Sequence, residues 1–183
     1  TTIVVGTISF AVVFGVFLTA MPSHLETRFS MTSGWRGFMI SVPALSSALV
    51  GFNLGRIRRK VNVRWALATS ALAWAVGMLF IGWAQVLPVL ILGTLCYGLG
   101  EGALIPHLQE VAMSEAPQEH RGAVVATWVG FARLGQTIGP LLAGAMLSAS
   151  GAPAVFVAGA VASALAAVIF VFGPIGRKAT IAH

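Results

Sequence analysis

The amino-acid sequence predicts an all-α, polytopic membrane protein with about six transmembrane helices, and two observations carry that prediction. Hydrophobic residues make up 57% of the 183 residues and charged residues only 9%, whereas about a quarter of the residues in a soluble domain are charged. No Asp, Glu, Lys, Arg or His occurs between Arg64 and Glu101, or between Arg133 and Arg177. About 20 apolar residues span the hydrocarbon core of a bilayer, so each stretch is long enough to cross it.

Six apolar segments follow one another along the chain, separated by polar or turn-forming residues. The predicted spans are residues 2–20, 35–54, 63–83, 86–112, 122–147 and 152–172. The first is expected to stop at Met21 and Pro22, with the polar His24 on the loop beyond it. The turn between the last two spans is expected near Gly151. We therefore expect a single six-helix bundle over residues 1–183. Because the chain opens on Thr rather than Met, we also expect it to begin partway through a longer protein.

The net charge of +6 comes from basic residues at the ends of these spans. Eight of the eleven Lys and Arg residues lie in the predicted connections near 55–64 and 113–121 and in the tail 174–183. The positive-inside rule places these regions, and hence both termini, in the cytoplasm. Because the charges flank apolar spans rather than cover a polar domain, the expected partner is the lipid bilayer and not nucleic acid.

Two ionisable residues are predicted at membrane depth, Glu101 in the fourth span and Arg133 in the fifth. Each lies about eleven residues from a span end, or roughly 16 Å deep at 1.5 Å per residue. Charges at this depth are costly, and consecutive antiparallel helices are usually neighbours, so we expect the two side chains to pair. The pair has two interpretations: it fixes helix packing, or Glu101 changes its protonation or partner during a transport cycle.

Three stripes of side chains accompany these charges on the predicted helices. They are Thr94, Tyr97, Glu101, Leu104 and Leu108 on the fourth span, Phe10, Phe14 and Phe17 on the first, and Arg133, Gln136 and Thr137 on the fifth. Apolar and aromatic walls with a few polar groups suit a small hydrophobic or cationic substrate. For the phenylalanines, packing against other helices or lipid is an equally good interpretation.

The stretch GFNLGRIRRK, residues 51–60, resembles the loop motif of the major facilitator superfamily. That motif reads Gly, three residues, Asp, Arg, any residue, Gly and two basic residues. Four positions match: Gly51, Arg56, Arg59 and Lys60. Gly55 stands where the acid is expected and Arg58 where the second glycine is expected, a decay typical of the C-terminal copy of the motif. The resemblance also implies that an acid, here Glu110, holds the motif to the helix bundle through Arg59.

Residues 97–144, which end in RLGQTIGPLLAG, resemble helices ten and eleven of bacterial drug:proton antiporters in the same superfamily. The corresponding helix-packing motif is Gly135, Gly139, Pro140 and Gly144. Thr94 lies in the region where the N-terminal copy carries an arginine. The resemblance therefore implies the C-terminal six-helix half of a twelve-helix transporter in the bacterial inner membrane, with the N-terminal half as its missing partner.

The function implied by this resemblance is proton-coupled export of drugs or hydrophobic small molecules by alternating access, with Glu101, Arg133, Tyr97, Thr94, Gln136 and Phe14 as the candidate substrate and proton pathway. The alternatives are an uptake permease for a sugar or organic acid, and a non-transporting membrane sensor or assembly protein. No nucleotide-binding glycine loop, nucleophile elbow or metal-ligand spacing occurs in the sequence. We therefore expect no enzyme activity, no cofactor and no metal, and a proton gradient as the energy source.

Overall fold

The computed structural model describes residues 2–114, 117–173 and 175, and helices make up nearly all of them. The elements are α1 (Thr2–Ala11), the π-helical η1 (Val12–Ala20), α2 (Met21–Phe29), α3 (Ser33–Lys60), α4 (Val63–Trp83), α5 (Leu87–Ser114), the short 3₁₀ helix η2 (Gln118–His120) and α6 (Arg121–Phe172). The prediction of an all-α membrane fold is confirmed, since five helices in this part of the chain are long and apolar enough to cross a bilayer.

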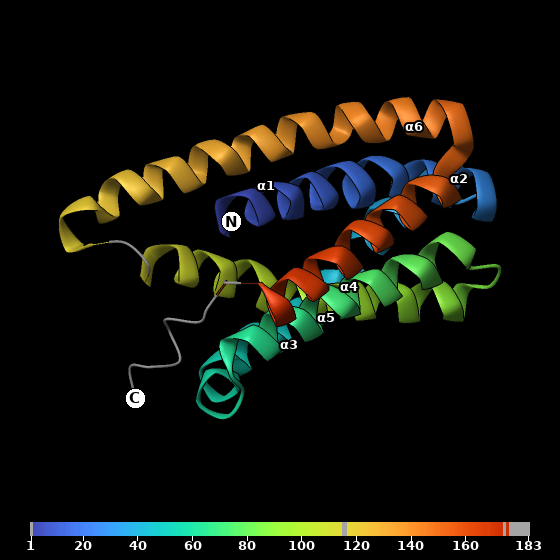
Figure 1. Ribbon diagram of the computed structural model, residues 1–183. Coiled ribbons are helices and arrows are strands. Elements are labelled where there is room, and N and C mark those ends of the chain that lie inside the picture. The colour runs from blue at the N-terminus through green and yellow to red at the C-terminus, as the bar shows by residue number, and fades with distance from the viewer. Residues whose placement is uncertain (1, 115–116, 174, 176–183) are drawn as a thin grey trace.

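The last of these helices contains two spans, because α6 is broken at Gly151. This residue has φ 77° and ψ 172°, a backbone conformation that glycine alone adopts readily. Figure 1 shows α6 running along one side of the molecule, turning sharply and returning across it. The turn predicted near Gly151 is thus confirmed, and the bundle has six crossings in the described residues.

The first span does not stop at Met21 and Pro22, as the sequence predicted. Instead α1, η1 and α2 form one continuous helix to Phe29. Pro22 lies in the first turn of α2, directly after the wider π-helical turns of η1, where a missing backbone N–H does not interrupt an α-helical ladder. His24, predicted on a loop, therefore lies in α2, where it is 3% exposed and packs edge-on against Phe156 at a centroid distance of 5.4 Å.

The connection predicted at 55–64 is much shorter in the structure, because α3 continues through Lys60. Cations in the last turn of a helix are favoured by its dipole, so a basic run is compatible with helix there. Only Val61 and Asn62 separate α3 from α4, and the Asn62 side chain caps α4 by accepting a hydrogen bond from the Arg64 backbone N–H at 3.0 Å. Of the predicted tail, 174–183, only Ile175 is among the described residues.

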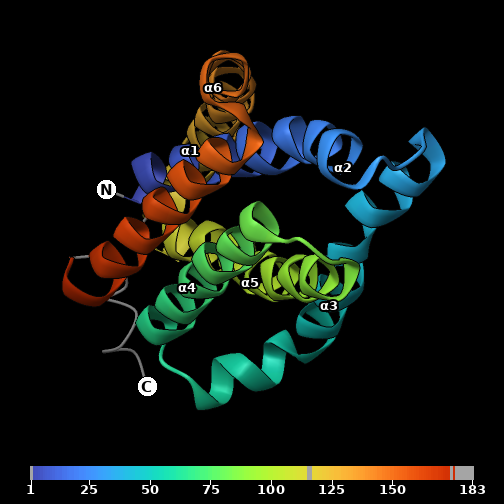
Figure 2. The same cartoon turned by 90° about the vertical axis from the view of Figure 1, so that its right-hand side faces the viewer.

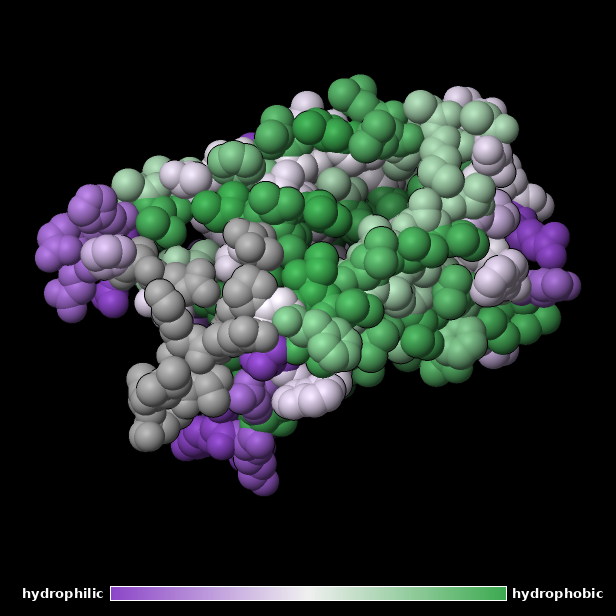
Figure 3. Space-filling model, in the orientation of Figure 1, coloured by the Kyte–Doolittle hydropathy of each residue, from purple (hydrophilic) through white to green (hydrophobic). Residues whose placement is uncertain are grey.

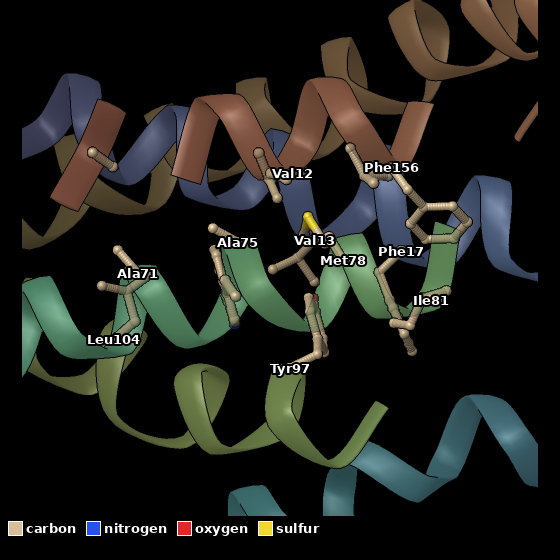
Figure 4. Close-up of a cluster of buried hydrophobic side chains, with 14 of the residues drawn as sticks. Val12, Val13, Phe17, Ala71, Ala75, Met78, Ile81, Tyr97, Leu104 and Phe156 are labelled. Atoms are coloured by element: carbon tan, nitrogen blue, oxygen red, sulfur yellow. The ribbon is translucent and has the colours of Figure 1, made fainter. Parts of the chain in front are cut away.

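The helices pack in an order that differs from their order in the sequence. α4 lies against α5 and α6, α5 also lies against α3, and α6 also packs along α1 and η1. Figure 2 shows α4 and α5 side by side, with α3 on the far side of α5 and α6 on the side of α1. Figure 4 shows Tyr97 of α5 pointing into the resulting core toward Val13 and Met78.

Glycines let the helices approach closely where they cross. A Cβ atom at Gly98 would lie well under 3.0 Å from the carbonyl oxygen of Pro43 in α3, and one at Gly102 would lie 2.6 Å from that of Ser47. Gly100 meets the backbone of α4 in the same way. Lipid gives helices no hydrophobic reason to associate, so close backbone contact of this kind supplies much of the packing energy.

A hydrogen bond between side chain and backbone adds to the α3–α5 crossing. The Ser46 hydroxyl donates to the Leu95 carbonyl oxygen at 2.8 Å. We expect Ser46→Ala to lower the free energy of unfolding by about 1 kcal/mol, the scale of such bonds between membrane helices. Unfolding in mixed micelles would measure it. The control is Ser41→Ala, because the exposed Ser41 bonds only within α3, to Phe38 at 2.7 Å; an equal loss in both variants would contradict the prediction.

The connections alternate between two ends of the bundle. The start of α1, the α3–α4 connection, η2 and the end of α6 lie toward the left of Figure 1, and the α2–α3, α4–α5 and Gly151 turns lie toward the right. Figure 3 shows hydrophilic residues gathered at these ends with a broad hydrophobic surface between them. Because the number of crossings is even, the start of α1 and the end of α6 lie at the same end of the bundle. That this end faces the cytoplasm remains a prediction.

Candidate functional site

Glu101 lies near the middle of a membrane-length helix. Fourteen residues of α5 precede it and thirteen follow, so its backbone is about 20 Å from each end of the helix. The residue is half-buried. Among the residues that the structure describes, the ion pairs are Arg36–Glu26 and Arg58–Glu110, and Glu101 belongs to neither. Glu101 is therefore a carboxyl group at mid-depth without a fixed cation among the described residues.

The predicted pair of Glu101 and Arg133 is not formed. Arg133 is exposed on α6, where its Nη1 donates a hydrogen bond to Gln136 Oε1 at 2.9 Å. The prediction assumed that consecutive helices are neighbours. In the structure α5 packs mainly on α3 and α4, while the first half of α6 lies along α1 and η1. Glu101 and Arg133 therefore lie on helices that pack mainly against different neighbours.

Arg133, Gln136 and Thr137 do share one polar face on α6, as predicted. Besides the bond from Arg133 to Gln136, the Thr137 hydroxyl donates to the Arg133 carbonyl oxygen at 3.0 Å. Arg133 and Thr137 are exposed in the middle of a span. An arginine is costly against lipid tails, so this face is better suited to a protein or water-filled surface than to lipid.

Tyr97 is the central ring of a three-ring stack that joins three helices. Phe17 of η1 stacks on Tyr97 with centroids 4.4 Å apart and planes 9° apart, and Trp74 of α4 stacks on it at 5.5 Å and 7°. Tyr97 is 0% exposed, and its hydroxyl has no hydrogen-bond partner in the described residues. The sequence interpretation did not single out Trp74, because nothing in its spacing distinguishes it from other apolar residues of α4.

Thr94 and Tyr97 were predicted to line a substrate pathway together with Glu101. Both are fully buried between helices in this structure, and the Thr94 hydroxyl donates to the Ile91 carbonyl oxygen at 2.8 Å. Only Glu101, one turn beyond Tyr97, is partly accessible. Within this stripe, Glu101 is therefore the residue that can meet a ligand without rearrangement of the helices.

The phenylalanine stripe of the first helix is split between two neighbours. Phe10 packs edge-on against Trp128 of α6, with centroids 6.3 Å apart, whereas Phe17 stacks on Tyr97 of α5. Phe14, between them, is half-buried. The turns of η1 hold more residues than α-helical turns, so side chains spaced for one α-helical face diverge. Of the three, Phe10 and Phe14 are partly accessible and Phe17 is buried, so Phe14 keeps some access for a role in a substrate pathway.

The loop motif places its charges on a helix, and a different arginine meets Glu110. Arg58 Nη2 lies 3.0 Å from Glu110 Oε2, so the predicted partner Arg59 was wrong by one residue. Successive residues of a helix point about 100° apart, and α3 turns Arg58 toward α5. Gly51 has no atom of a described residue within 4 Å of a Cβ position, and Arg56 donates to Asn53 at 3.1 Å.

The packing motif of α6 contacts the first helix through two of its members. A Cβ at Gly139 would lie 2.7 Å from Ala11 Cα, and one at Gly135 would overlap the Thr7 carbonyl oxygen. Pro140 is half-buried next to this crossing. Gly144, predicted to pack with them, has no atom within 4 Å of a Cβ position in the described residues. The crossing is therefore confined to the first part of the motif.

Comparisons with known proteins agree with this arrangement. The profile of the Major Facilitator Superfamily matches residues 3–181. The chain is 30% identical over 150 residues to YhhS of Escherichia coli (strain K12), described as an uncharacterized MFS-type transporter, with 80% of this chain and 36% of that protein covered. YhhS of Salmonella typhimurium is 28% identical over 150 residues. The chain thus covers 36% of the length of these curated relatives.

Solved transporter structures share the fold. The human organic anion transporter MFSD10 (TETRAN) superposes with a TM-score of 0.83 at 24% identity, over 92% of this chain and 39% of that one. A POT family transporter in complex with 5-aminolevulinic acid gives 0.80 at 14% identity, over 93% and 37%. At these identities the likeness describes the fold, and it extends over nearly all of the chain.

Proposed function

Because the chain belongs to the Major Facilitator Superfamily, we propose that it is the C-terminal six-helix half of a twelve-helix, proton-coupled exporter of hydrophobic or cationic small molecules. The half-transporter part of this proposal is supported by length. Six crossings account for nearly all of the described residues, and this chain covers only 36% to 39% of its relatives and structural neighbours. The proposed location is the bacterial inner membrane, with both termini in the cytoplasm.

Two exposed surfaces support a second half as the partner. α3 exposes a series of large apolar side chains: Trp35, Phe38, Leu45, Leu49 and Phe52. On α6, the polar face around Arg133 is exposed at mid-span. An N-terminal half that covers both helices would shield Arg133 from lipid and leave it at a central, partly aqueous site.

Glu101 is the single observation that carries the proposed coupling. A carboxylate at mid-depth needs a proton, a cation or water to be tolerated, and no described side chain supplies a fixed cation. If a proton and a cationic substrate compete for this one group, loading of one releases the other. Alternation of the two halves about the site then exchanges protons for substrate across the membrane.

A second candidate is transport of an organic acid, which Arg133 favours. Its guanidinium group is exposed and held in place by Gln136, and guanidinium geometry suits a carboxylate. One structural neighbour is named an organic anion transporter, and an uptake permease for such a substrate keeps the same fold.

Proteoliposomes of the full-length protein test the proposal. With an imposed pH gradient, we expect accumulation of a fluorescent lipophilic cation that stops when a protonophore collapses the gradient. Accumulation of a fluorescent organic anion instead would establish the second candidate. Movement of neither probe would contradict both and favour a sensor or assembly protein.

A further inference from the structure

A pocket of about 790 Å³ opens where α3, α4 and α5 meet at one end of the bundle. Its lining residues are Arg58, Arg59, Lys60, Val61, Asn62, Val63, His107, Glu110, Val111 and Ser114. The pocket is far from mid-span, because α3 ends at Lys60, α4 begins at Val63 and α5 ends at Ser114. It is therefore separate from the central site around Glu101.

The charge of this pocket is positive after its internal ion pair is taken into account. Among the residues that the structure describes, three basic residues and one acid line it, and Arg58 is neutralised by Glu110 at 3.0 Å. Arg59 and Lys60 are left as exposed cations. The N-terminus of α4, a 21-residue helix, lies at the same place and adds the positive end of its dipole. The arrangement favours a bound anion.

A buried histidine forms part of the pocket wall. His107 is 1% exposed, and its Nδ1 lies 2.7 Å from the Ala103 carbonyl oxygen. A carbonyl oxygen only accepts hydrogen bonds, so Nδ1 carries a proton, and in the neutral ring Nε2 is an acceptor for a hydroxyl or N–H donor of a ligand. Packing of the ring thus fixes a polar group in the wall, beside the flexible Arg59 and Lys60.

Three valines also line the pocket, besides the polar Asn62 and Ser114, and they indicate the kind of anion. Val61, Val63 and Val111 lie beside the cations, so a ligand that fills the pocket has an apolar part next to its charge. Trp65, half a turn into α4, is 58% exposed, and exposed tryptophans near span ends lie at the level of lipid headgroups. Basic pockets between transmembrane helices at this level suit phosphate headgroups.

We propose that this pocket binds the phosphate of an anionic phospholipid, with Arg59 and Lys60 as its cationic ligands. Val61, Val63 and Val111 contact the glycerol and first methylene groups. Arg58 is held by Glu110 and keeps α3 and α5 together around the lipid. The phosphate chemistry is shared with free inorganic phosphate, but only the lipid also uses the apolar wall.

The test compares two variants of the full-length protein that remove basic residues from the same helix. Arg59→Gln/Lys60→Gln removes the two pocket cations. Arg56→Gln removes an exposed arginine that does not line the pocket and bonds Asn53. Native mass spectrometry of detergent-solubilised protein titrated with phosphatidylglycerol, with phosphatidylcholine as the neutral comparison, measures the dissociation constants.

We expect the double variant to bind phosphatidylglycerol about 25-fold more weakly, since each basic residue near an anionic lipid contributes about fivefold. Arg56→Gln should change binding less than twofold, and 10 mM inorganic phosphate should not displace the lipid. Equal weakening in both variants would show a diffuse surface charge and overturn the site. Equal binding of the two lipids, or displacement by inorganic phosphate, would overturn the lipid assignment.

Discussion

Glu101→Gln in the full-length transporter is expected to reduce gradient-driven transport to the level of protein-free vesicles, while membrane insertion is unchanged. Glutamine keeps the size and hydrogen-bonding capacity of the side chain but does not exchange a proton in the physiological range. Because no described cation pairs with Glu101, the substitution leaves no unpaired partner charge and should not destabilise the bundle. The measurement is substrate accumulation in proteoliposomes under an imposed pH gradient.

Two further variants separate proton coupling from other effects of the Glu101 change. Glu119→Gln removes an exposed acid from η2 and should transport at the original rate. Glu101→Asp keeps a titratable carboxyl group and should retain part of the activity. Unchanged transport by Glu101→Gln would contradict the coupling role, although the fold and family of the chain would stand.

Gly139→Ala is expected to destabilise the bundle by about 1–3 kcal/mol, the usual cost of overpacking a tight contact. Its new Cβ would lie 2.7 Å from Ala11 Cα and also within 3.0 Å of the Ala11 carbonyl oxygen. Both atoms belong to backbone, which does not move aside as the end of a side chain does. The first helix and α6 must therefore separate. Reversible unfolding in mixed micelles would measure the loss of free energy.

Gly144→Ala is the matched control, because both glycines belong to the same sequence motif on the same helix. No described atom lies within 4 Å of a Cβ at Gly144, so we expect a change within about 0.5 kcal/mol of the original protein. A large loss at Gly144, or none at Gly139, would show that the α1–α6 crossing has been placed wrongly.

Helix boundaries were predicted less well than helix number. Pro22 and the basic run before Lys60 both look like breaks when only neighbouring residues are considered. The structure accommodates the first with the π-helical turns of η1 and carries α3 through the second. Residues that disfavour a helix locally can still be helical when packing stabilises the whole helix, and this is the case at both places.

Side-chain partners were predicted least well, and the errors have two physical causes. Glu101 and Arg133 were paired on the assumption that consecutive helices touch, whereas α5 and the first half of α6 have other neighbours. Arg59 was matched to Glu110 where Arg58 makes the contact. In the second case, one residue of helical rotation changes which side chain faces the neighbouring helix.

A side-chain contact at the end of α6 was also not predicted from the sequence. Arg64 was predicted only as a topology signal, yet its side chain donates to the carbonyl oxygens of Phe170, at 3.3 Å, and Val171 at the end of α6. Those carbonyls have no partner within their own helix. A contact between residues 64 and 171 leaves no trace in local composition.

The sequence by itself determined the membrane class, the six crossings and the turn at Gly151, because hydrophobic length and glycine backbone freedom are properties of short segments. It also placed Glu101 at mid-depth, since depth follows from counting residues along one helix. Only the tertiary structure decided which helices touch, which glycines lie at a crossing and which arginine meets Glu110. These depend on the rotation and order of helices in the bundle, and close packing selects one arrangement among several that the same apolar pattern allows.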